Sequence, residues 1–297
     1  MREPRVIRML PDGRRLHLYD GPIDLIIEAS GTPPAISAAY EAARQRFVSI
    51  LDELCGELPL LRSRTRNNSP RPRGVVAQRM FDAVEPFSEQ CFITPMAAVA
   101  GSVAEEILES MITATTLDRA YVNNGGDIAI HLSDLESYKI GMVERPDRPS
   151  LFGSLQIAAA DPVRGIATSG WRGRSFSLGI ADAVTVLADC ASAADAAATV
   201  IANAVNLPDH PGITRIPARE ISPDSDLGDL LVTRGVEPLS GSQIAAALDS
   251  GAREAEILRA RGLIHSSALC LQGHTRVVSP LLAHGCIKFS QRSLLHA

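Results

Sequence analysis

The apolar residues near the start of the chain change from alternating to helical spacing. Residues 14–29 alternate between apolar and polar positions on both sides of Asp20-Gly21. This pattern predicts a β-hairpin, because Asp-Gly between alternating runs suits a tight turn. From 34 to 61 the apolar residues recur every three or four positions, which predicts a helix with one buried face. The polar, Pro-containing segment 62–74 is expected to be a loop.

A second long helix is predicted after Pro95. Val99, Val103, Ile107 and Met111 recur four positions apart, so they share one face of a helix. Apart from Val99, the first turns of this helix contain only alanine, glycine and serine. Small side chains allow another backbone or a ligand to approach closely. The sequence leaves both of these possibilities open.

The rest of the chain is dominated by strand patterns, with further Ala-rich helices. Residues 208–238 contain several prolines and are expected to be irregular. The other expected elements are a strand–turn–strand over 120–132, strands within 137–144, 153–160 and 165–170, a buried strand over 183–188, a helix over 192–207 with Ser192 as N-cap, helical structure over 241–262 and a hairpin over 263–278.

Composition and charge exclude several classes of protein. The net charge of -5 and the pI near 5.8 give no basic footprint for nucleic acid, and aromatic residues make up only 4% of the chain. The five cysteines are dispersed, which argues against a disulfide framework or a zinc site and predicts buried, inert thiols. No apolar stretch is long enough for a signal-peptide core or a membrane span. These features together predict a soluble, cytoplasmic protein.

Five arginines lie within residues 62–73, interleaved with Asn, Ser and Pro. Such a segment is most simply a solvated loop, and the alternative is a loop that faces phosphate or an anionic partner. No composition break or internal repeat divides the chain, so residues 1–297 are expected to form a single domain. Residues 280–297 are expected to form a loosely ordered tail, since terminal residues often do.

The first segment that could carry chemistry is Asn123-Asn124-Gly125-Gly126-Asp127, which lies between two strand patterns. Paired glycines permit positive φ angles and expose backbone N–H groups, which can attract a phosphate. The alternative is an ordinary hairpin turn, because Asn-Gly is a common signal for one. The local sequence favours the hairpin turn.

The second segment follows a strand pattern and is rich in phosphate-binding residue types. Thr168, Ser169 and Gly170 precede Trp171, and Arg172 and Arg174 come directly after it. Hydroxyls donate hydrogen bonds, glycine opens the backbone, and arginine binds phosphate with a charged fork. Trp171 could stack on a base or fill the edge of the core. We favour a phosphate-binding role for this segment over a polar surface loop.

The third segment places Asp195 and Thr199 four residues apart in an Ala-rich helical pattern. Residues with this spacing share a helix face, and their hard oxygens suit Mg²⁺ or Ca²⁺. Alternatively, Asp195 only complements the helix dipole. Asp182 is either a further carboxylate near this site or an acceptor for local N–H groups. No histidine pairing accompanies Ser169, so we assign no nucleophile and no catalytic residue.

These three segments, in this order, resemble the ApbE family of FAD:protein FMN transferases. NNGGDIAI resembles the family's Asn-(x)-Gly-Gly-Asp turn, GIATSG its Ala-Thr-Ser-Gly segment, and SAADAAAT its Ala-Asp-Ala-(x)-(x)-Thr metal helix. The helix around Ala98 to Gly101 resembles the segment that supplies a carbonyl ligand for magnesium. The likeness covers about 94–205, and it is nearest to an uncharacterised bacterial and archaeal branch that shares most of the stretch 165–188.

The resemblance implies an α+β fold, single-core and T-fold-like, with sheets packed against long Ala-rich helices. It also implies Mg²⁺ as a cofactor and FAD or FMN as the flavin. The implied cofactor-binding residues are Asn124, Gly125, Gly126, Asp127, Thr168, Ser169, Gly170, Arg172 and Arg174, and the implied metal ligands are Asp195 and Thr199.

The chain departs from the family pattern in three places. Ala100-Gly101 stands where the family has Lys-Gly, and the short segment SFSLGIAD replaces a longer loop of the form His-(x)-(x)-(x)-Pro-(x)-(x)-Gly. The periplasmic targeting signal common in the family is absent. Two functions therefore stay open. One is a Mg²⁺-dependent FMN transferase, or another enzyme that processes a flavin or nucleotide cofactor. The other is a non-catalytic protein that binds such a cofactor.

The partners that the sequence implies follow from these two functions. A transferase would act on a flavin or another nucleotide-like small molecule, and a threonine or serine of a partner protein would be the acceptor. Ala-rich faces such as 194–204 pack well against a symmetric copy, so a homo-oligomer is expected. No nucleic acid and no membrane are expected as partners.

Overall fold

The computed structural model describes residues 4–143, 151–279 and 287–289, and these form two compact units. The first unit comprises Met1–Ser137, Ala158–Ala167 and Asp189–Ala196. The second unit comprises Tyr138–Ile157, Thr168–Ala188 and Ala197–Ala297. The chain passes between the units five times, after residues 137, 157, 167, 188 and 196. Two of these passages lie within β8 (Gly165–Ser169) and α5 (Ala191–Ala204). The expectation of a single domain stays a prediction.

The first unit is built on an antiparallel sheet. Its strands follow the order β1-β2-β3-β4-β5-β8, and each neighbouring pair is antiparallel. In β3 the alternation predicted from the sequence is visible in the burial, since every second side chain from Ile23 to Ala29 is buried. The strands before β8 are β1 (Val6–Met9), β2 (Leu16–Asp20), β3 (Ile23–Ser30), β4 (Arg119–Asn124) and β5 (Asp127–Leu132).

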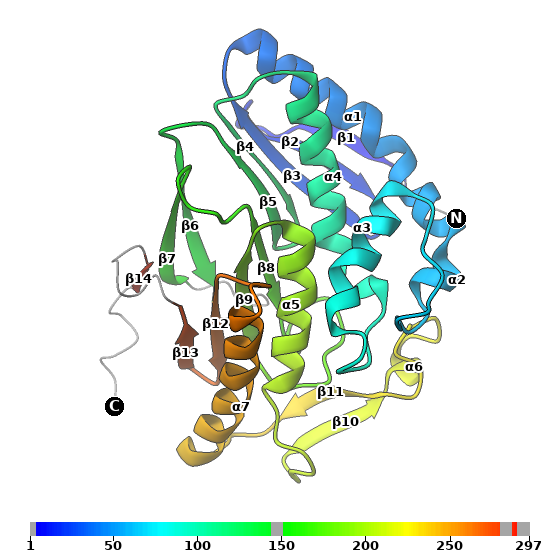
Figure 1. Ribbon diagram of the computed structural model, residues 1–297, viewed down its shortest axis with the longest axis vertical. Helices are drawn as coiled ribbons and strands as arrows, with labels where there is room; N and C mark the ends of the chain where they lie inside the picture. The colour runs from blue at the N-terminus through cyan, green and yellow to red at the C-terminus, as the bar shows by residue number, and fades with distance from the viewer. Residues whose placement is uncertain (1–3, 144–150, 280–286, 290–297) are drawn as a thin grey trace. The chain divides into compact units, whose positions relative to one another are not determined.

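Helices cover one face of this sheet and form the core of the first unit with it. Helix α1 contacts β2 and β3, and α4 contacts β4, β5 and α1 (Figure 1). The helix α1 begins after Thr32, whose side chain accepts a hydrogen bond from the Ala35 N–H. The helices are α1 (Pro33–Gly56), α2 (Leu58–Leu61), α3 (Val75–Val84) and α4 (Val99–Ala114), with the 3-10 turns η1 (Glu85–Phe87) and η2 (Pro95–Ala98).

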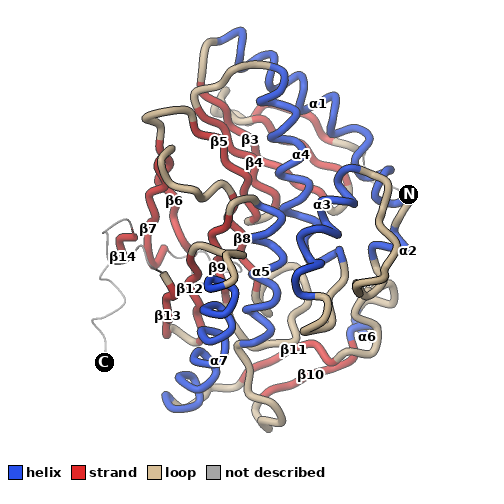
Figure 2. The backbone as a smooth tube through the Cα atoms, viewed as in Figure 1, coloured by secondary structure: helices blue, strands red, loops and turns tan. Residues whose placement is uncertain are grey.

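The second unit contains three smaller groups of strands and a long helix. Helix α7 (Gly241–Ala260) packs on β12 and β13 (Figure 2), and a capping box of Ser240 and Gln243 begins it. The strands are β9 (Ala183–Ala188), β12 (Ser266–Leu271) and β13 (His274–Val278) in one antiparallel group, β6 (Ser137–Val143), β7 (Leu151–Ala158) and β14 (Ile287–Phe289) in another, and the pair β10 (Ile213–Pro217) and β11 (Leu231–Val236).

The mixture of helices and antiparallel sheets confirms the α+β prediction. The prediction that residues 208–238 are irregular is wrong, because β10, β11 and the short helix α6 (Ala218–Ile221) lie there. A connection that includes α6 joins the two strands instead of a tight turn, so no turn signal marks the pair. Helix α3, which lacks a side-chain N-cap, is not among the expected elements. The predicted tail 280–297 lies outside the described residues, except for β14.

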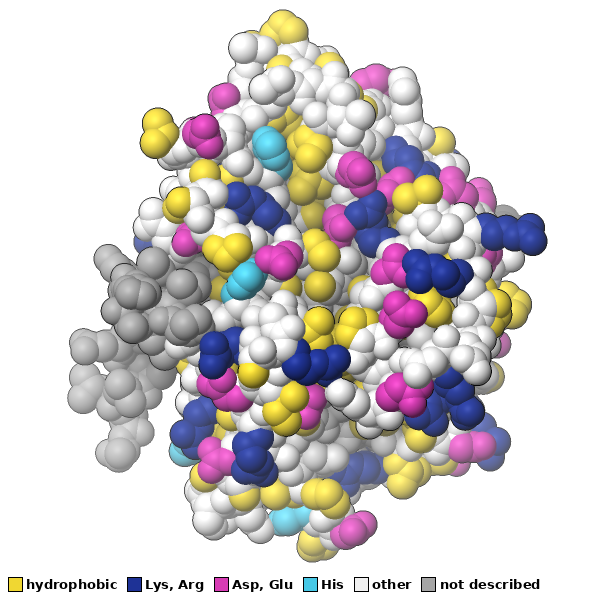
Figure 3. All heavy atoms as spheres, in the orientation of Figure 1, with side chains coloured by type: hydrophobic (Ala, Val, Ile, Leu, Met, Phe, Trp, Pro, Cys, Tyr) yellow, Lys and Arg dark blue, Asp and Glu magenta, His cyan; other side chains and the backbone are white. Residues whose placement is uncertain are grey.

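The burial of the described cysteines and the distribution of surface charge can be compared with the sequence predictions. Four cysteines are free, but Cys55 is exposed, so the prediction of buried thiols is wrong for this residue; Cys286 lies outside the described residues. Cys55 occupies the last turn of α1, where its neighbour Leu54 is the residue turned toward the core. On the face drawn in Figure 3, acidic and basic side chains are interspersed.

Candidate functional site

The Gly125-Gly126 pair forms the two-residue turn between β4 and β5. Asn124 and Asp127 are direct partners in the ladder, and the φ angles of Gly125 and Gly126 are +67° and +120°. Positive φ at both central positions is the geometry that tight hairpins need and that glycine adopts without strain. The Gly126 N–H donates to Asn123 Oδ1 across 2.9 Å. The structure therefore confirms the hairpin turn, and phosphate binding by the turn stays a prediction.

Asn124 joins this hairpin to the start of α4. The side chain is 7% exposed, and its Nδ2 donates to the Ala100 carbonyl oxygen across 3.1 Å. Its Oδ1 accepts a longer hydrogen bond, 3.4 Å, from the Asp24 N–H. Both ends of the Asn124 amide are thus engaged by the protein. In the first unit, this residue fixes the Gly-Gly turn beside the first turn of α4.

The Asp195 carboxylate caps the N-terminus of α4. Helix α4 has Ala98 at its N-cap position and no side-chain cap of its own. The Gly101 N–H donates to Asp195 Oδ2 across 3.0 Å, and the Ala100 N–H also donates to this carboxylate. The first N–H groups of a helix have no partner within the helix, so an acceptor here stabilises it. Asp195 of α5 thereby supplies the cap that the local sequence of α4 lacks.

Helices α4 and α5 approach each other so closely that Gly101 has no room for a side chain. A Cβ atom at Gly101 would lie 2.3 Å from the carbonyl oxygen of Ala191, which is far inside van der Waals contact. The small residues at the start of α4 therefore admit another backbone at this position. Of the two possibilities that the sequence left open, the structure shows close backbone approach at Gly101.

The carboxylate of Glu105 in α4 caps the start of α5 in return. Glu105 Oε2 accepts hydrogen bonds from the Ser192 N–H, across 3.2 Å, and from the Ser192 hydroxyl, across 2.9 Å. Glu105 also forms an ion pair with Arg79 of α3. The helix α5 begins at Ala191, so Ser192 lies inside the helix and is not its N-cap. The predicted N-cap lies two residues after the N-cap position, residue 190, and Glu105 provides the acceptor at this end.

The electrostatic environment of Asp195 is unfavourable for an isolated negative charge. Burial raises the pKa of the Asp195 carboxyl well above its ordinary value, and the charge of Asp127 raises it further. The N–H groups of Gly101 and Ala100 act in the opposite direction. The negative charges of Asp195 and Asp127 repel each other in a partly desolvated environment. A cation bound nearby would offset this repulsion and stabilise both charges.

The side chains available to a cation at this position are few. Across 4–143, 151–279 and 287–289, no group of three or more His, Cys, Asp or Glu side chains could hold a metal ion. Thr199 lies one helical turn after Asp195 in the continuous helix α5, as predicted, and the three intervening alanines are buried. Hard oxygens of a carboxylate and a hydroxyl fit Mg²⁺, which usually keeps water or phosphate oxygens as its other ligands.

In the second unit, Asp182 holds the segment that follows Ser169. Asp182 is 4% exposed, and its Oδ1 accepts from Arg172 Nε across 2.5 Å and from Trp171 Nε1 across 3.2 Å. Its Oδ2 accepts from the Gln272 N–H across 2.6 Å. Asp182 therefore acts as an acceptor for N–H groups, which is one of the two roles that its sequence context suggested. Arg172 is bound to the protein by Nε.

Other residues of this segment have separate surroundings. The Thr168 hydroxyl lies 3.0 Å from the Thr185 hydroxyl. Gly170 leaves no space for a side chain, because a Cβ atom there would lie 2.6 Å from the Asp182 carbonyl oxygen. Ser169 is half-buried, and Arg174 is exposed. Close backbone packing therefore requires glycine at position 170. In the sequence this requirement looks the same as a glycine that opens the backbone to a phosphate.

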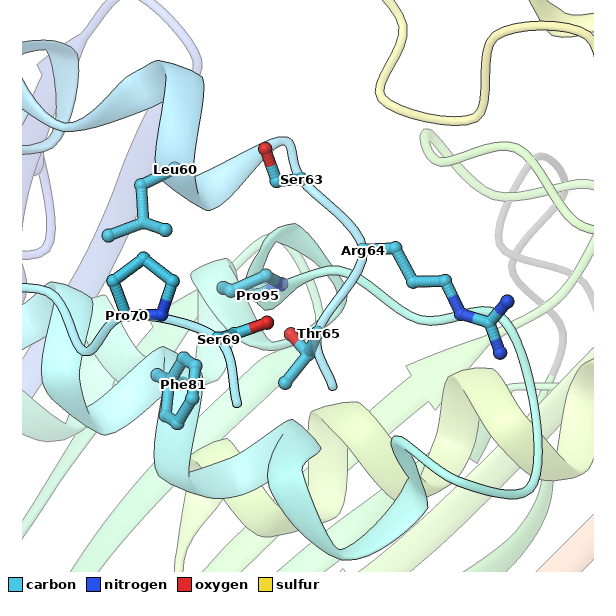
Figure 4. Close-up of a pocket in the computed structure, with 8 residues that line it drawn as sticks. All are labelled: Leu60, Ser63, Arg64, Thr65, Ser69, Pro70, Phe81 and Pro95. Atoms are coloured by element: carbon cyan, nitrogen blue, oxygen red, sulfur yellow. The ribbon is translucent and has the colours of Figure 1, made fainter. Parts of the chain in front are cut away.

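A small cavity lies elsewhere in the first unit, beside the arginine-rich loop. Its volume is about 140 Å³ (Figure 4). The buried Thr65 hydroxyl has no hydrogen-bond partner among the described residues, and Figure 4 shows it directed toward Ser69. Arg64 extends away from the cavity and lies over the ring of Phe92. The lining residues are Leu60, Ser63, Arg64, Thr65, Ser69, Pro70, Phe81 and Pro95, and they include none of the predicted site residues.

Comparison with known proteins gives matches over most of the chain. A family model described as AbpE bacteria matches residues 7–277. A UPF0280 protein from Methanopyrus kandleri is 37% identical over 186 residues, which are 61% of this chain and 69% of that protein. A UPF0280 protein from Methanosarcina acetivorans is 32% identical over 184 residues, which are 62% of this chain and 70% of that protein.

A likeness to solved structures is more distant. A mutant of the flavin transferase ApbE from Vibrio cholerae aligns with 95% of this chain and 98% of its own chain, at 10% identity and a TM-score of 0.38. This likeness is too remote to support an argument about the chemistry of this chain. Among the helices of the described residues, none is both long and apolar enough to cross a membrane.

Proposed function

We propose, from the premise that the chain belongs to the AbpE bacteria family, that it is a cytoplasmic, Mg²⁺-dependent enzyme that acts on a flavin cofactor. The reaction we propose is the transfer of FMN from FAD to a hydroxyl of an acceptor protein. The observation that carries the proposal is the Asp195 carboxylate, which lies in the field of Asp127 at the N-terminal end of α4. Such a carboxylate is a suitable ligand for a cation that also binds phosphate.

Asp195 and Thr199 would hold the magnesium ion. A carboxylate offers about four lone-pair positions, so the N–H groups of Gly101 and Ala100 leave some of them for a cation. When bound, Mg²⁺ would neutralise the diphosphate of the cofactor and favour departure of the leaving phosphate. The N–H groups at the start of α4 would keep the Asp195 carboxylate in one orientation.

The remaining predicted residues would bind the cofactor through their own donors. The Gly125 backbone would offer its N–H to an oxyanion, and Gly126, whose own N–H is bonded to Asn123 Oδ1, would let the ligand approach the backbone closely. The hydrogen bond from Asn124 to the Ala100 carbonyl oxygen would hold this turn in place. In the second unit, Thr168 and Ser169 would offer hydroxyls, and Arg172 and Arg174 would offer charged donors, together with the backbone of Gly170.

A second function is favoured by the short connection between β8 and β9. Residues 170–182 contain no histidine, and their carboxylate, Asp182, is occupied by N–H donors. No residue in this connection is therefore placed to act as a general base. A protein that binds FAD or another nucleotide cofactor without transforming it fits this feature.

The two functions are separated by one experiment on the purified chain. Incubation with FAD, Mg²⁺ and a threonine-containing acceptor should give AMP and a flavin-labelled acceptor if the chain is a transferase. The same incubation with EDTA should give neither product. Unchanged FAD that stays bound to the protein would support the binding function instead. Absence of flavin binding with and without Mg²⁺ would contradict both functions.

A further inference from the structure

The Arg172 guanidinium in the second unit is held on two sides and leaves its outer edge available. Nε donates to the buried Asp182 carboxylate across 2.5 Å, and the guanidinium carbon lies 4.3 Å from the centroid of the Trp171 ring. The terminal nitrogens of Arg172 have no hydrogen-bond or ion-pair partner within the described part of the chain. The side chain is 23% exposed, so a small anion can reach it.

Trp171 is fixed by the same carboxylate. Its indole Nε1 donates to Asp182 Oδ1, and its backbone N–H donates to the Ala181 carbonyl oxygen across 3.0 Å. A guanidinium stacked on an indole gains cation–π attraction and loses freedom to rotate. Asp182 therefore sets the orientation of both the ring and the charged group that lies over it.

Asp182 is in turn bound by the backbone N–H of Gln272, a residue with an uncommon backbone conformation. Gln272 has a φ of +45° in the turn between β12 and β13, which is unusual for a residue with a side chain. The Gln272 side chain donates to the Glu237 carbonyl oxygen across 2.8 Å and accepts from the Leu239 N–H across 3.0 Å. These bonds keep the turn in place, and its backbone N–H donates to Asp182. Backbone strain of this kind persists where the surroundings enforce it.

We infer that Asp182 is a positioning residue, which fixes Arg172 flat on Trp171 so that its two terminal nitrogens form a ready fork for a phosphate group. The ligand class is a phosphate monoester or diphosphate, since the fork matches two phosphate oxygens. This inference deepens the proposed function, and it rests on that function only for the flavin part of the ligand. Arg174 is exposed, and the inference concerns Arg172 alone.

The test compares ligands with and without phosphate. Isothermal titration would measure the binding of inorganic pyrophosphate, FMN and riboflavin to the wild type, Asp182→Asn, Arg172→Ala and the double variant. We expect the Kd of FMN and pyrophosphate to rise about tenfold in each single variant, with riboflavin unchanged. The double variant should bind no more weakly than Arg172→Ala, because both changes remove the same interaction. Arg234→Ala, an exposed arginine of β11, serves as the matched control.

The emission of the chain's single tryptophan reports the arrangement directly. Asp182→Asn should raise the acrylamide quenching of Trp171 at an unchanged far-UV circular dichroism spectrum. Should Asp182→Asn fail to fold, Arg172→Lys replaces it, since lysine keeps the charge but has no planar fork. That variant should weaken FMN and pyrophosphate and leave riboflavin unchanged.

Three outcomes would overturn the inference. They are equal weakening of FMN and riboflavin, unchanged FMN and pyrophosphate affinities in the variants, and a wild type that binds no phosphate-bearing ligand. If the variants leave the binding of FMN unchanged while the wild type transfers FMN, the inference fails and the proposed function stands. If pyrophosphate binds through Asp182 and Arg172 but no flavin binds, the inference stands and the proposed function fails.

Discussion

The Gly101 N–H donates to Asp195 Oδ2 across 3.0 Å, so a carboxylate of α5 caps the first turn of α4. Glu105 of α4 accepts from Ser192 of α5 in return. The two helices thus satisfy each other's terminal N–H groups. The Asp195 carboxylate is thus both a helix cap and the proposed metal ligand.

Replacement of Asp195 by asparagine or alanine should separate the cap from the charge. The asparagine side-chain oxygen can still accept from the Gly101 N–H, whereas alanine cannot. Both variants lack the charge, so their difference reports the cap alone. We expect the free energy of unfolding of Asp195→Ala to be about 1 kcal/mol lower than that of Asp195→Asn. Urea denaturation followed by circular dichroism would measure both, and equal stabilities would show that the cap contributes nothing.

Addition of a methyl group at Gly101 should destabilise the first unit. A Cβ atom there would lie 2.3 Å from the Ala191 carbonyl oxygen, and neither helix backbone can yield cheaply. We expect Gly101→Ala to lower the free energy of unfolding by about 2 kcal/mol or more. Gly56→Ala is the matched control, because a Cβ atom at Gly56 meets nothing within 4 Å. A Gly101→Ala protein as stable as this control would contradict the close packing of α4 on α5.

The thiol of Cys190 should react slowly at neutral pH. Burial raises the pKa of the Cys190 thiol, and the nearby charge of Glu105 raises it further. A raised pKa means that less of the reactive thiolate is present at a given pH, and that the rate rises only as the pH approaches the raised value. The rate of alkylation by iodoacetamide, followed by peptide mass spectrometry from pH 7 to 10, would measure this.

The variant Glu105→Gln provides a control on the cause of the Cys190 shift. Removal of the negative charge should move the midpoint of the alkylation profile to lower pH. An alkylation midpoint for Cys190 at or below that of an ordinary thiol, near pH 8.5, would contradict the described environment. Profiles that coincide in the wild type and Glu105→Gln would assign the whole shift to burial.

Much of the framework is visible in the sequence. Gly-Gly between two strand patterns predicts the turn at Gly125, and helical spacing predicts that Asp195 and Thr199 share one helix. The match over residues 7–277 confirms the resemblance to the ApbE family. These features can be predicted because they depend on the spacing of nearby residues or on the order of motifs along the chain.

The partners of the site residues could not be predicted in this way. One donor to Asp195, the Gly101 N–H, lies 94 residues earlier in the chain, and one donor to Asp182, the Gln272 N–H, lies 90 residues later. Such pairs form through packing of distant segments, which periodicity does not encode. The small residues of α4 allow either a backbone or a ligand to approach closely, and the structure identifies the Ala191 carbonyl as the group that does so at Gly101. Helix α3 has no side-chain N-cap, but its buried Val76, Met80 and Val84 recur four positions apart, so helical spacing is the signal that marks it.

The central claim is that Asp195 binds a divalent cation shared with a phosphate-bearing cofactor. Isothermal titration of FAD into the wild type and Asp195→Asn, each with Mg²⁺ and with EDTA, tests it most directly, with Asp134→Asn as an exposed-carboxylate control. We expect Mg²⁺ to strengthen FAD binding at least about tenfold in the wild type and the control, and to have no effect in Asp195→Asn. The same Mg²⁺ dependence in Asp195→Asn as in the wild type would contradict the claim.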